Sequence, residues 1–376
     1  MEHYLDNSAT TRVSEGAAKA AYDAMTINYG NPSSTYLLGR EAKKIVDDSR
    51  ICIANALGCT VNELYFTSCG SESDNWAILS GADFMHRKGK HVISSEVEHD
   101  AVRKSLDKLE LMGYEVTRLK PEKNGSVSPD AVKKALRNDT VLVSLMMVNN
   151  ETGAITDIKA ISDVLKSCDS HALLHTDAVQ AFMKIPFSAK TLGADMISIS
   201  GHKIHAPKGI GALYIKKGLN IKPYLVGGSQ ESGLRAGTES VPLIAAFGEA
   251  AKEAYTDFDS HINHMTKLRD YAKERIINEI PEAVIINAES PHILSISMPG
   301  WRSEVIMNML ESKGVYVSKS SACKKGGRSH VLEAIGLDAR IIDGAIRIGL
   351  SRFTDADDIN ALISGLIEAR DTIRHR

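Results

Sequence analysis

ALLHTDAVQAFMKIPFSAKTLGADMISISGHK, residues 172–203, contains two short apolar runs, ALLHTDA (172–178) and DMISIS (195–200). Each run has the length and the apolar or β-branched character of a buried strand. Polar residues follow both runs, with Gln180 after the first and Lys203 after the second. In α/β sheets, ligands collect at the carboxyl ends of the strands. This stretch therefore predicts an α/β fold with a polar site at one edge of the sheet.

The alternation of strands and helices continues on both sides of this stretch. Further strand candidates are HVISS (91–95), TVLVSLMMV (140–148) and GALYI (211–215). Amphipathic helix candidates lie between the strands, at 71–89, 100–113, 128–136 and 157–168. This order is typical of βαβ units, so we expect an α/β large domain whose mostly parallel sheet is flanked by helices.

A second, smaller α/β unit is predicted in the C-terminal part. A long helical pattern at 239–280 leads into it, and a final helix begins at about 354. Strand candidates in this unit are HILSISM (292–298), VYVS (315–318) and AIRIGLS (345–351). We expect the large domain to span 13–250 and the small domain to span 251–376, together with the N-terminal segment 1–12.

Composition excludes several classes of function. The 376 residues are 43% hydrophobic and 24% charged, with a net charge of -2, which gives no reason to expect nucleic-acid or membrane binding. The N-terminus lacks a signal peptide and no apolar run approaches ~18 residues, so we expect a cytoplasmic protein. No GxGxxG or GxxxxGK[ST] motif is present, which disfavours dinucleotides and nucleotide hydrolysis.

The cysteines and histidines show no metal or disulfide spacing. The five cysteines are widely spaced and include no CxxC pair, and the 13 histidines form no HExxH motif. We therefore expect no metal site and no disulfide framework. Any cysteine chemistry should belong to a single thiol.

The predicted strand ends and helix starts carry an amine, a carboxylate, amides, imidazoles and hydroxyls. In chain order these residues are Gly70, Ser71, His99, Asn150, Asp177, Gln180, Ser200, His202 and Lys203. Pyridoxal phosphate needs a lysine for a Schiff base, a carboxylate for its pyridinium nitrogen, and a helix start for its phosphate. Each residue alone has an ordinary alternative role as a helix cap or a core or surface group. Together they predict a pyridoxal-phosphate site.

The sequence resembles the cysteine desulfurases, which are class V aminotransferase-type pyridoxal-phosphate enzymes, over nearly its entire length. The similar blocks are YLDNSATT (4–11), GNPSS (30–34), TSCGSESDN (67–75), EVEHDAV (96–102), VNNETG (148–153), HTDAVQ (175–180), SGHKIHAPKGIGALY (200–214), LRAGTES (234–240), SSAC (320–323) and IRIGLSRFT (346–354). The resemblance implies a homodimer that converts L-cysteine to L-alanine.

The resemblance also implies a role for each site residue. Lys203 would form the Schiff base, Asp177 would hold the pyridinium proton and Gln180 would bind the ring hydroxyl. His99 would stack on the ring and help to move protons. The phosphate would be held by Gly70, Ser71, Ser200 and His202, and by Thr238 from the neighbouring subunit. Asn150 and Arg347 would bind the substrate carboxylate, although a surface position for Arg347 is an alternative.

Cys323 would attack the substrate sulfur and become a persulfide. Its surroundings, KSSACKKGGR (319–328), are polar and contain glycines, which fits a mobile reactive loop better than a buried inert cysteine. The basic residues of this segment should lower the pKa of the thiol below its free value of ~8.5. They are Lys319, Lys324, Lys325 and Arg328.

The sulfur acceptor is predicted from two departures from the long-loop members of the family. The loop after Cys323 is short, and the chain stops at Arg376 without a C-terminal extension. Both features favour a tRNA-thiolation enzyme over an iron–sulfur scaffold as the acceptor protein. A selenocysteine lyase, another class V transaminase or lyase, and a binding protein without cofactor are the alternatives. The intact Lys203 and Cys323 disfavour the last of these.

Overall fold

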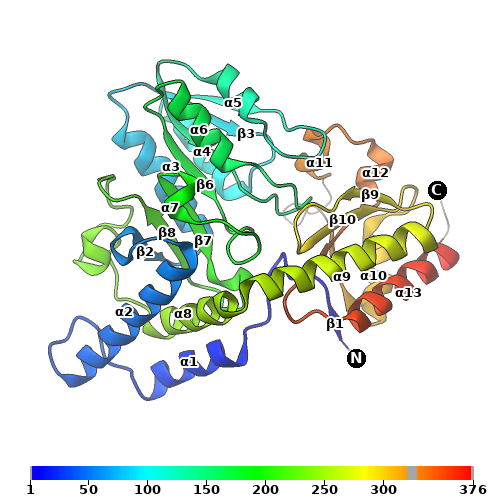
Figure 1. Cartoon of the computed structure of the whole chain (residues 1–376), viewed down its shortest axis with the longest axis horizontal. Coiled ribbons are helices and arrows are strands. Elements are labelled where there is room, and N and C mark those ends of the chain that lie inside the picture. The colour runs from blue at the N-terminus through cyan, green and yellow to red at the C-terminus, as the bar shows by residue number, and fades with distance from the viewer. Residues whose placement is uncertain (1, 320–327, 374–376) are drawn as a thin grey trace.

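The computed structural model describes residues 2–319 and 328–373. Within these residues a seven-stranded sheet has the order β2-β8-β7-β6-β5-β3-β4 (Figure 1). Its strands are β2 (Leu64–Thr67), β8 (Gly211–Ile215), β7 (Met196–Ser200), β6 (Leu173–Asp177), β5 (Thr140–Ser144), β3 (His91–Ser95) and β4 (Glu115–Leu119). The strands from β7 to β4 are parallel, and β8 is antiparallel to both of its neighbours. The predicted mostly parallel sheet is confirmed.

Helices cover both faces of this sheet, which explains why its strands read as continuous apolar runs. One face packs on α3 (Gly70–Phe84) and α4 (Asp100–Leu111). The other face is covered by α2 (Leu37–Leu57), α5 (Pro129–Ala135), α6 (Ile158–Ser167), α7 (Ala189–Leu192) and α8 (Val241–Thr256), and α1 (Glu15–Thr26) packs against α8. Leu173 of β6 belongs to the α3 side and Leu174 to the other. Because side chains alternate along a strand, His175 and Asp177 also face α3.

One predicted strand is too long. The apolar run 140–148 forms a strand only as far as Ser144, and the rest is a buried loop that leads to a turn. Asn149 makes this turn, because its side-chain oxygen accepts hydrogen bonds from the backbone N–H groups of Glu151 and Thr152. Asn150 therefore lies in a tight loop and does not directly follow a strand.

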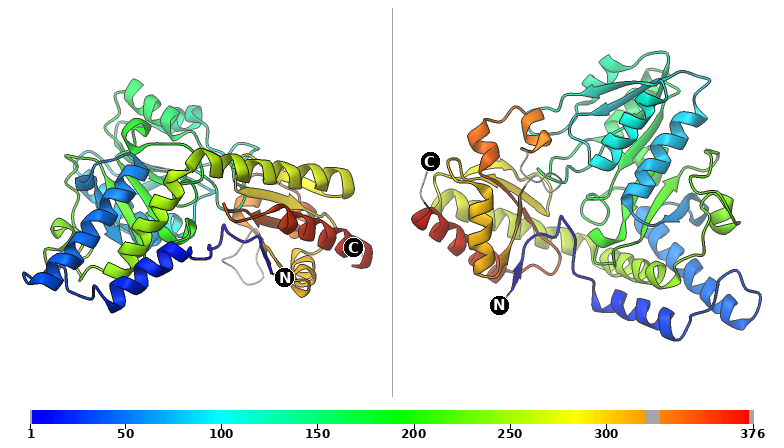
Figure 2. Two further views of the ribbon diagram at one scale, coloured as in Figure 1. Left: turned by 60° about the horizontal axis from the view of Figure 1, so that its bottom comes forward. Right: turned by 180° about the vertical axis from the view of Figure 1, so that it is seen from behind.

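A second sheet forms the C-terminal part. Its order is β12-β13-β10-β9 and all its pairs are antiparallel. The strands are β12 (Ser318–Lys319), β13 (Ala345–Gly349), β10 (Ile293–Ser297) and β9 (Val284–Asn287). A separate core joins this sheet to α9 (Phe258–Glu279), α10 (Ser303–Ser312) and α13 (Ala356–Thr372). Figure 2 shows α9 extending from the end of α8 along the second sheet.

The N-terminal segment joins the second sheet's side of the molecule. Strand β1 (His3–Tyr4) pairs in parallel with β11 (Val315–Tyr316), and Leu5 belongs to the core of the second sheet. The predicted strand 315–318 is thus divided between β11 and β12. The domain limits at residues 12 and 250 stay predictions. Within the described residues, no helix has the length and apolar character needed to cross a membrane.

Candidate active site

Lys203 lies directly after β7, in the short 3-10 helix η2 (Gly201–Lys203). Its Nζ donates hydrogen bonds to the backbone carbonyl oxygens of Ser8, at 2.6 Å, and Ala9, at 2.7 Å. The N-terminal segment therefore crosses the strand end and holds the amine. Burial lowers the pKa of Lys203 to about 7, and the positive charge of Arg347 adds to this effect. The result is an amine with a large neutral fraction near neutral pH, as a nucleophilic lysine requires.

Asp177 and Gln180 lie beside this amine at the end of β6. Asp177 is buried, and its Oδ1 accepts a hydrogen bond of 2.9 Å from the backbone N–H of Val179. Burial raises the pKa of Asp177, whereas the nearby His99 and Lys203 oppose that rise. Gln180 Nε2 donates to the carbonyl oxygen of Ser8, which also accepts from Lys203. The carboxylate, the amide and the amine thus form one cluster, as the sequence predicts.

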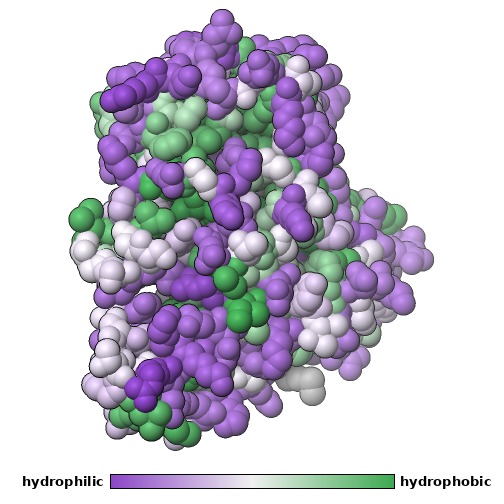
Figure 3. Space-filling model, turned by 60° about the vertical axis from the view of Figure 1, so that its left-hand side comes forward, coloured by the Kyte–Doolittle hydropathy of each residue, from purple (hydrophilic) through white to green (hydrophobic). Residues whose placement is uncertain are grey.

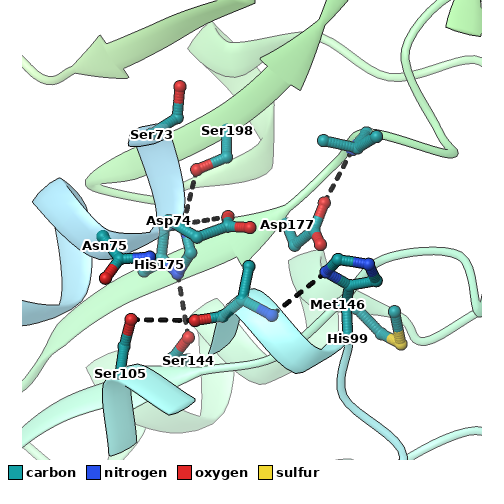
Figure 4. Close-up of polar contacts among 12 residues, drawn as sticks. Ser73, Asp74, Asn75, His99, Ser105, Ser144, Met146, His175, Asp177 and Ser198 are labelled. Atoms are coloured by element: carbon teal, nitrogen blue, oxygen red, sulfur yellow. Dashed lines mark hydrogen bonds and ion pairs between the residues drawn. The ribbon is translucent and has the colours of Figure 1, made fainter. Parts of the chain in front are cut away.

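His99 caps the N-terminus of α4 (Figure 4). Its Nδ1 accepts a hydrogen bond of 3.2 Å from the backbone N–H of Ala101. In a neutral imidazole the other nitrogen, Nε2, must then carry the hydrogen. The capping contact therefore fixes both the tautomer and the orientation of a ring that lies near Asp177.

The predicted phosphate residues lie at the start of α3 and the end of β7. The hydroxyl of Ser200 is buried and has no hydrogen-bond partner among the described residues, whereas Ser71 is exposed in the first turn of α3. A Cβ on Gly70 would lie 2.7 Å from Cγ2 of Val179, so any larger residue here would have to displace the Val179 side chain. His202 Nδ1 lies 3.2 Å from Thr10 Oγ1. An unpaired hydroxyl beside an open helix start fits a phosphate.

Arg347, on β13, is 2% exposed, so the alternative of a surface arginine is wrong. Its Nη2 donates to Asp6 Oδ1, at 2.9 Å, and to Ser318 Oγ, at 2.7 Å. Its Nη1 donates to the backbone carbonyl of Asn150 at 2.6 Å. Its Nε is buried without a hydrogen-bond partner among the described residues. The guanidinium thus joins the N-terminal segment, the Asn150 loop and β12, and it contacts the backbone of Asn150.

Thr238 is exposed in the segment between the 3-10 helix η3 (Gln230–Gly233) and α8. Arg235, three residues earlier, forms an ion pair with Glu72 in the first turn of α3, with 2.8 Å between Nε and Oε1. This pair holds the Thr238 segment near the helix start that is predicted to bind phosphate. The contribution of Thr238 to a neighbouring subunit stays a prediction.

Cys323, Lys324 and Lys325 lie outside the described residues, but both neighbouring segments are at the site. On one side, Ser318 pairs with Arg347 in the second sheet. On the other side, the hydroxyl of Ser329 donates to Oε2 of Glu151, in the same loop as Asn150. The segment that contains Cys323 therefore begins and ends beside the candidate site.

Two of the basic residues expected to activate the thiol are already paired. Lys319 Nζ lies 2.6 Å from Glu304 Oε1, and Arg328 Nε lies 2.8 Å from Asp343 Oδ1. The carboxylates offset much of the positive charge that the sequence alone suggests at these two positions.

Sequence reasoning missed several contributors to the site. The carbonyl groups of Ser8 and Ala9 hold Lys203, and the buried acids Asp74 and Glu98 lie on the α3 side of the sheet. The blocks YLDNSATT, TSCGSESDN and EVEHDAV contain all four of these residues, so their positions were detectable while their contacts were not.

Comparison with known proteins agrees with this geometry. The Aminotransferase class-V family matches residues 3–362. The cysteine desulfurase IscS of Methanosarcina thermophila is 41% identical over 378 residues, which cover 99% of this chain and 93% of that protein. A cysteine desulfurase of Nostoc sp. (strain PCC 7120) is 40% identical over 376 residues, again with 99% and 93% coverage.

Solved structures show the same relationship. A NifS-like protein superposes with a TM-score of 0.93 at 35% identity, and the match covers 99% of this chain and 100% of that one. A NifS-like protein from Rickettsia africae superposes with a TM-score of 0.88 at 30% identity, with the same coverage. Enzymes of this group use pyridoxal phosphate, which fits the amine, carboxylate and unpaired hydroxyl described above. The chain therefore belongs to the class V aminotransferase family and, within it, to the pyridoxal-phosphate-dependent cysteine desulfurases.

Proposed function

We propose that this protein converts L-cysteine to L-alanine, moves the sulfur to Cys323 as a persulfide, and passes it to an acceptor protein. The observation that carries this proposal is the position of the two described residues, Ser318 and Ser329, that flank the segment with Cys323. Ser318 accepts a hydrogen bond from Arg347, and Ser329 donates one to Glu151 in the Asn150 loop. Cys323 is four residues from Lys319, so chain length alone allows it to reach about 14 Å from that residue.

The cofactor, when bound, supplies an electron sink that weakens the bonds at the substrate's α-carbon. Lys203 is the proposed attachment point, because its amine is held by carbonyl oxygens at the strand end. Asp177 is proposed to keep the pyridinium nitrogen protonated. His99 is proposed to stack on the ring and to move protons through Nε2, since its Nδ1 is occupied by the helix cap.

Substrate binding is assigned to Arg347 and the Asn150 loop. A guanidinium binds a carboxylate well because it offers parallel donors. In the structure Arg347 is paired with Asp6, so the substrate carboxylate must share or replace that partner. The Nε of Arg347 has no hydrogen-bond partner among the described residues, so its N–H can donate to the substrate carboxylate.

The sulfur step is balanced without an outside oxidant. The Cys323 thiolate attacks the substrate sulfur, and the carbon–sulfur bond breaks with its electron pair left on carbon. That carbon takes up a proton and alanine leaves, while Cys323 keeps the sulfur as a persulfide. A later thiol acceptor removes the sulfur and restores the cysteine.

The proposed test compares Cys323→Ser with Cys168→Ser, which changes an exposed cysteine away from the site. Cys323→Ser should keep cofactor absorbance and lose alanine formation, because a serine hydroxyl is a poor nucleophile toward sulfur. Cys168→Ser should keep both. Alanine formation at the wild-type rate in Cys323→Ser would rule out the proposal. Selenocysteine as the substrate, with selenide as the measured product, tests the lyase alternative.

A homodimer is proposed because apolar side chains lie exposed on the side that carries the Thr238 segment. Val226, shortly before η3, is 90% exposed. Exposed apolar residues of α1, α2 and their connection are Tyr22, Met25, Ile27, Tyr29, Tyr36 and Leu37. Figure 3 shows hydrophobic side chains on this side of the molecule. Val226→Glu should weaken self-association in sedimentation equilibrium, and a monomeric wild type with full cofactor occupancy would contradict the dimer.

The acceptor is proposed to be a tRNA-thiolation enzyme, with an iron–sulfur scaffold as the second candidate. When sulfur-labelled cysteine is incubated with this protein and each candidate acceptor, more label should appear on the tRNA-thiolation enzyme than on the iron–sulfur scaffold. Preferential labelling of the scaffold would reverse the assignment. A cytoplasmic location likewise stays a prediction.

A further inference from the structure

Asp74 is a buried carboxyl group in α3, on the face of the sheet that Asp177 also faces. The residue is 1% exposed, and its Oδ1 has no hydrogen-bond partner among the described residues. The nearest base is His175, whose Nε2 lies 3.7 Å from that oxygen. This distance is beyond a hydrogen bond. An ionised carboxylate in this position would be both desolvated and poorly paired.

His175 cannot supply the missing positive charge. The ring lies between two serines of the neighbouring strands (Figure 4), with Nδ1 2.8 Å from Ser144 Oγ and Nε2 3.0 Å from Ser198 Oγ. All three residues are fully buried. Burial lowers the pKa of His175 to about 3, so the imidazole is neutral at physiological pH. Asp74 therefore faces a neutral ring.

The other groups that act on Asp74 make ionisation harder. Asp177 lies two residues after His175 on the same face of β6, and Glu98 precedes α4; both are buried acids. Burial raises the pKa of Asp74 well above its usual value, and the charge of Asp177 adds to the rise. The Ser198 hydroxyl opposes the rise, and it carries no charge.

We propose that Asp74 is a neutral carboxylic acid in the working protein and acts as a positioning residue through Asp177. Its hydrogen is donated toward Ser198, whose own hydrogen is donated to Nε2 of His175. Nδ1 of His175 then donates to Ser144. Ser198 and His175 then each accept one hydrogen bond and donate one, which fits a neutral histidine.

The consequence concerns Asp177, so this inference rests on the proposed function of that residue. Two neighbouring buried carboxyl groups do not both ionise readily, because each negative charge raises the pKa of the other. With Asp74 neutral, the negative charge is left to Asp177, where it can hold a pyridinium proton. An ionised Asp74 would instead favour a protonated Asp177, which cannot do so.

Infrared difference spectroscopy of the cofactor-free protein tests the protonation state directly. Subtracting the Asp74→Asn spectrum from the wild-type spectrum at neutral pH should show the loss of one carboxylic-acid C=O band that shifts in D2O. Asp163→Asn is the matched control, since Asp163 is an exposed carboxylate paired with Lys159. Glu98→Gln identifies the band of the other buried acid. Loss of a carboxylate band in Asp74→Asn, with the acid bands unchanged, would overturn the proposal.

The pH dependence of unfolding gives a second readout. A carboxyl group whose pKa is raised by folding adds stability at low pH that is lost as the pH rises above the unfolded value of about 4. The equilibrium constant for unfolding is the ratio of unfolded to folded protein. This constant for the wild type, divided by the same constant for Asp74→Asn, should therefore rise by up to about tenfold per pH unit above pH 4. A ratio that stays flat between about pH 4 and 7 contradicts a neutral Asp74.

Asp177→Asn separates this inference from the proposed function. Removing the charge of Asp177 should move the titration of the Asp74 acid band to lower pH in the cofactor-free protein. An unchanged titration would refute the coupling. If the band and its shift are observed but Asp177→Asn keeps wild-type turnover, then the assignment of Asp177 fails while the neutral state of Asp74 stands.

Discussion

The low pKa of Lys203 predicts an unusually reactive amine. With a pKa of about 7, about half of the Lys203 side chains are neutral at pH 7. An ordinary lysine, with a pKa near 10.4, is neutral in only about one molecule in 2,500 at that pH. The neutral amine is the nucleophile, so Lys203 should have roughly a thousandfold larger reactive fraction than an ordinary lysine at neutral pH.

Competitive labelling of the cofactor-free protein measures this fraction. The protein is exposed briefly to an amine-reactive reagent between pH 5 and 11, and each lysine-containing peptide is quantified by mass spectrometry. Labelling of Lys203 should reach its midpoint near pH 7, with the exposed Lys190 as internal standard. Lys203→Ala identifies the peptide. Labelling of Lys203 that rises only together with Lys190 would refute the reasoning.

The cause of the shift can be tested in the same experiment. Burial is the main cause, and the charge of Arg347 is the next. Arg347→Gln should therefore move the midpoint to higher pH. Arg352→Gln is the matched control, because Arg352 is a largely buried arginine that is paired with Glu253. A midpoint that moves equally in both variants would show that general loosening, and not the charge of Arg347, sets the pKa.

Three further predictions concern the cofactor and substrate. Asp177→Asn should keep the cofactor but lower turnover by about 10²-fold or more, since a neutral amide cannot hold the pyridinium proton; near-normal turnover would count against this role. Gly70→Val should weaken cofactor binding in an absorbance titration, because even a Cβ would lie 2.7 Å from Val179, and an unchanged affinity would place the phosphate elsewhere. Arg347→Lys should raise KM for cysteine more than it lowers kcat, because lysine lacks the paired donors; an unchanged KM would remove the carboxylate from this residue.

Much of the sheet could be predicted because its strands are buried on both faces. The predicted strands 91–95 and 211–215 have the observed bounds of β3 and β8. The run 140–148 misled because residues 145–148 are also buried, although they lie in a loop. An apolar run shows burial, and it does not by itself distinguish a strand from a buried loop. The turn at Asn149 depends on side-chain hydrogen bonds that the pattern does not show.

The site residues could be named from their order, but their partners could not. Arg347 contacts Asp6, which is 341 positions away in the chain. Lys319 and Arg328 looked like unpaired positive charges because their partners, Glu304 and Asp343, are each 15 positions distant. Such pairings are set by the packing of the second sheet and its helices. The sequence pattern therefore identified the positive charges of Lys319 and Arg328 but not the carboxylates that pair with them.

The central claim is that Cys323 receives the sulfur. The most direct measurement is peptide mass mapping of the wild-type protein after brief exposure to cysteine without reductant, followed by alkylation of free thiols. We predict the mass of one additional sulfur atom on the peptide that contains SSACKK, and its absence from Cys323→Ser. Sulfur on the peptides of Cys52, Cys59, Cys69 or Cys168, or alanine release with no sulfur on Cys323, would contradict the account.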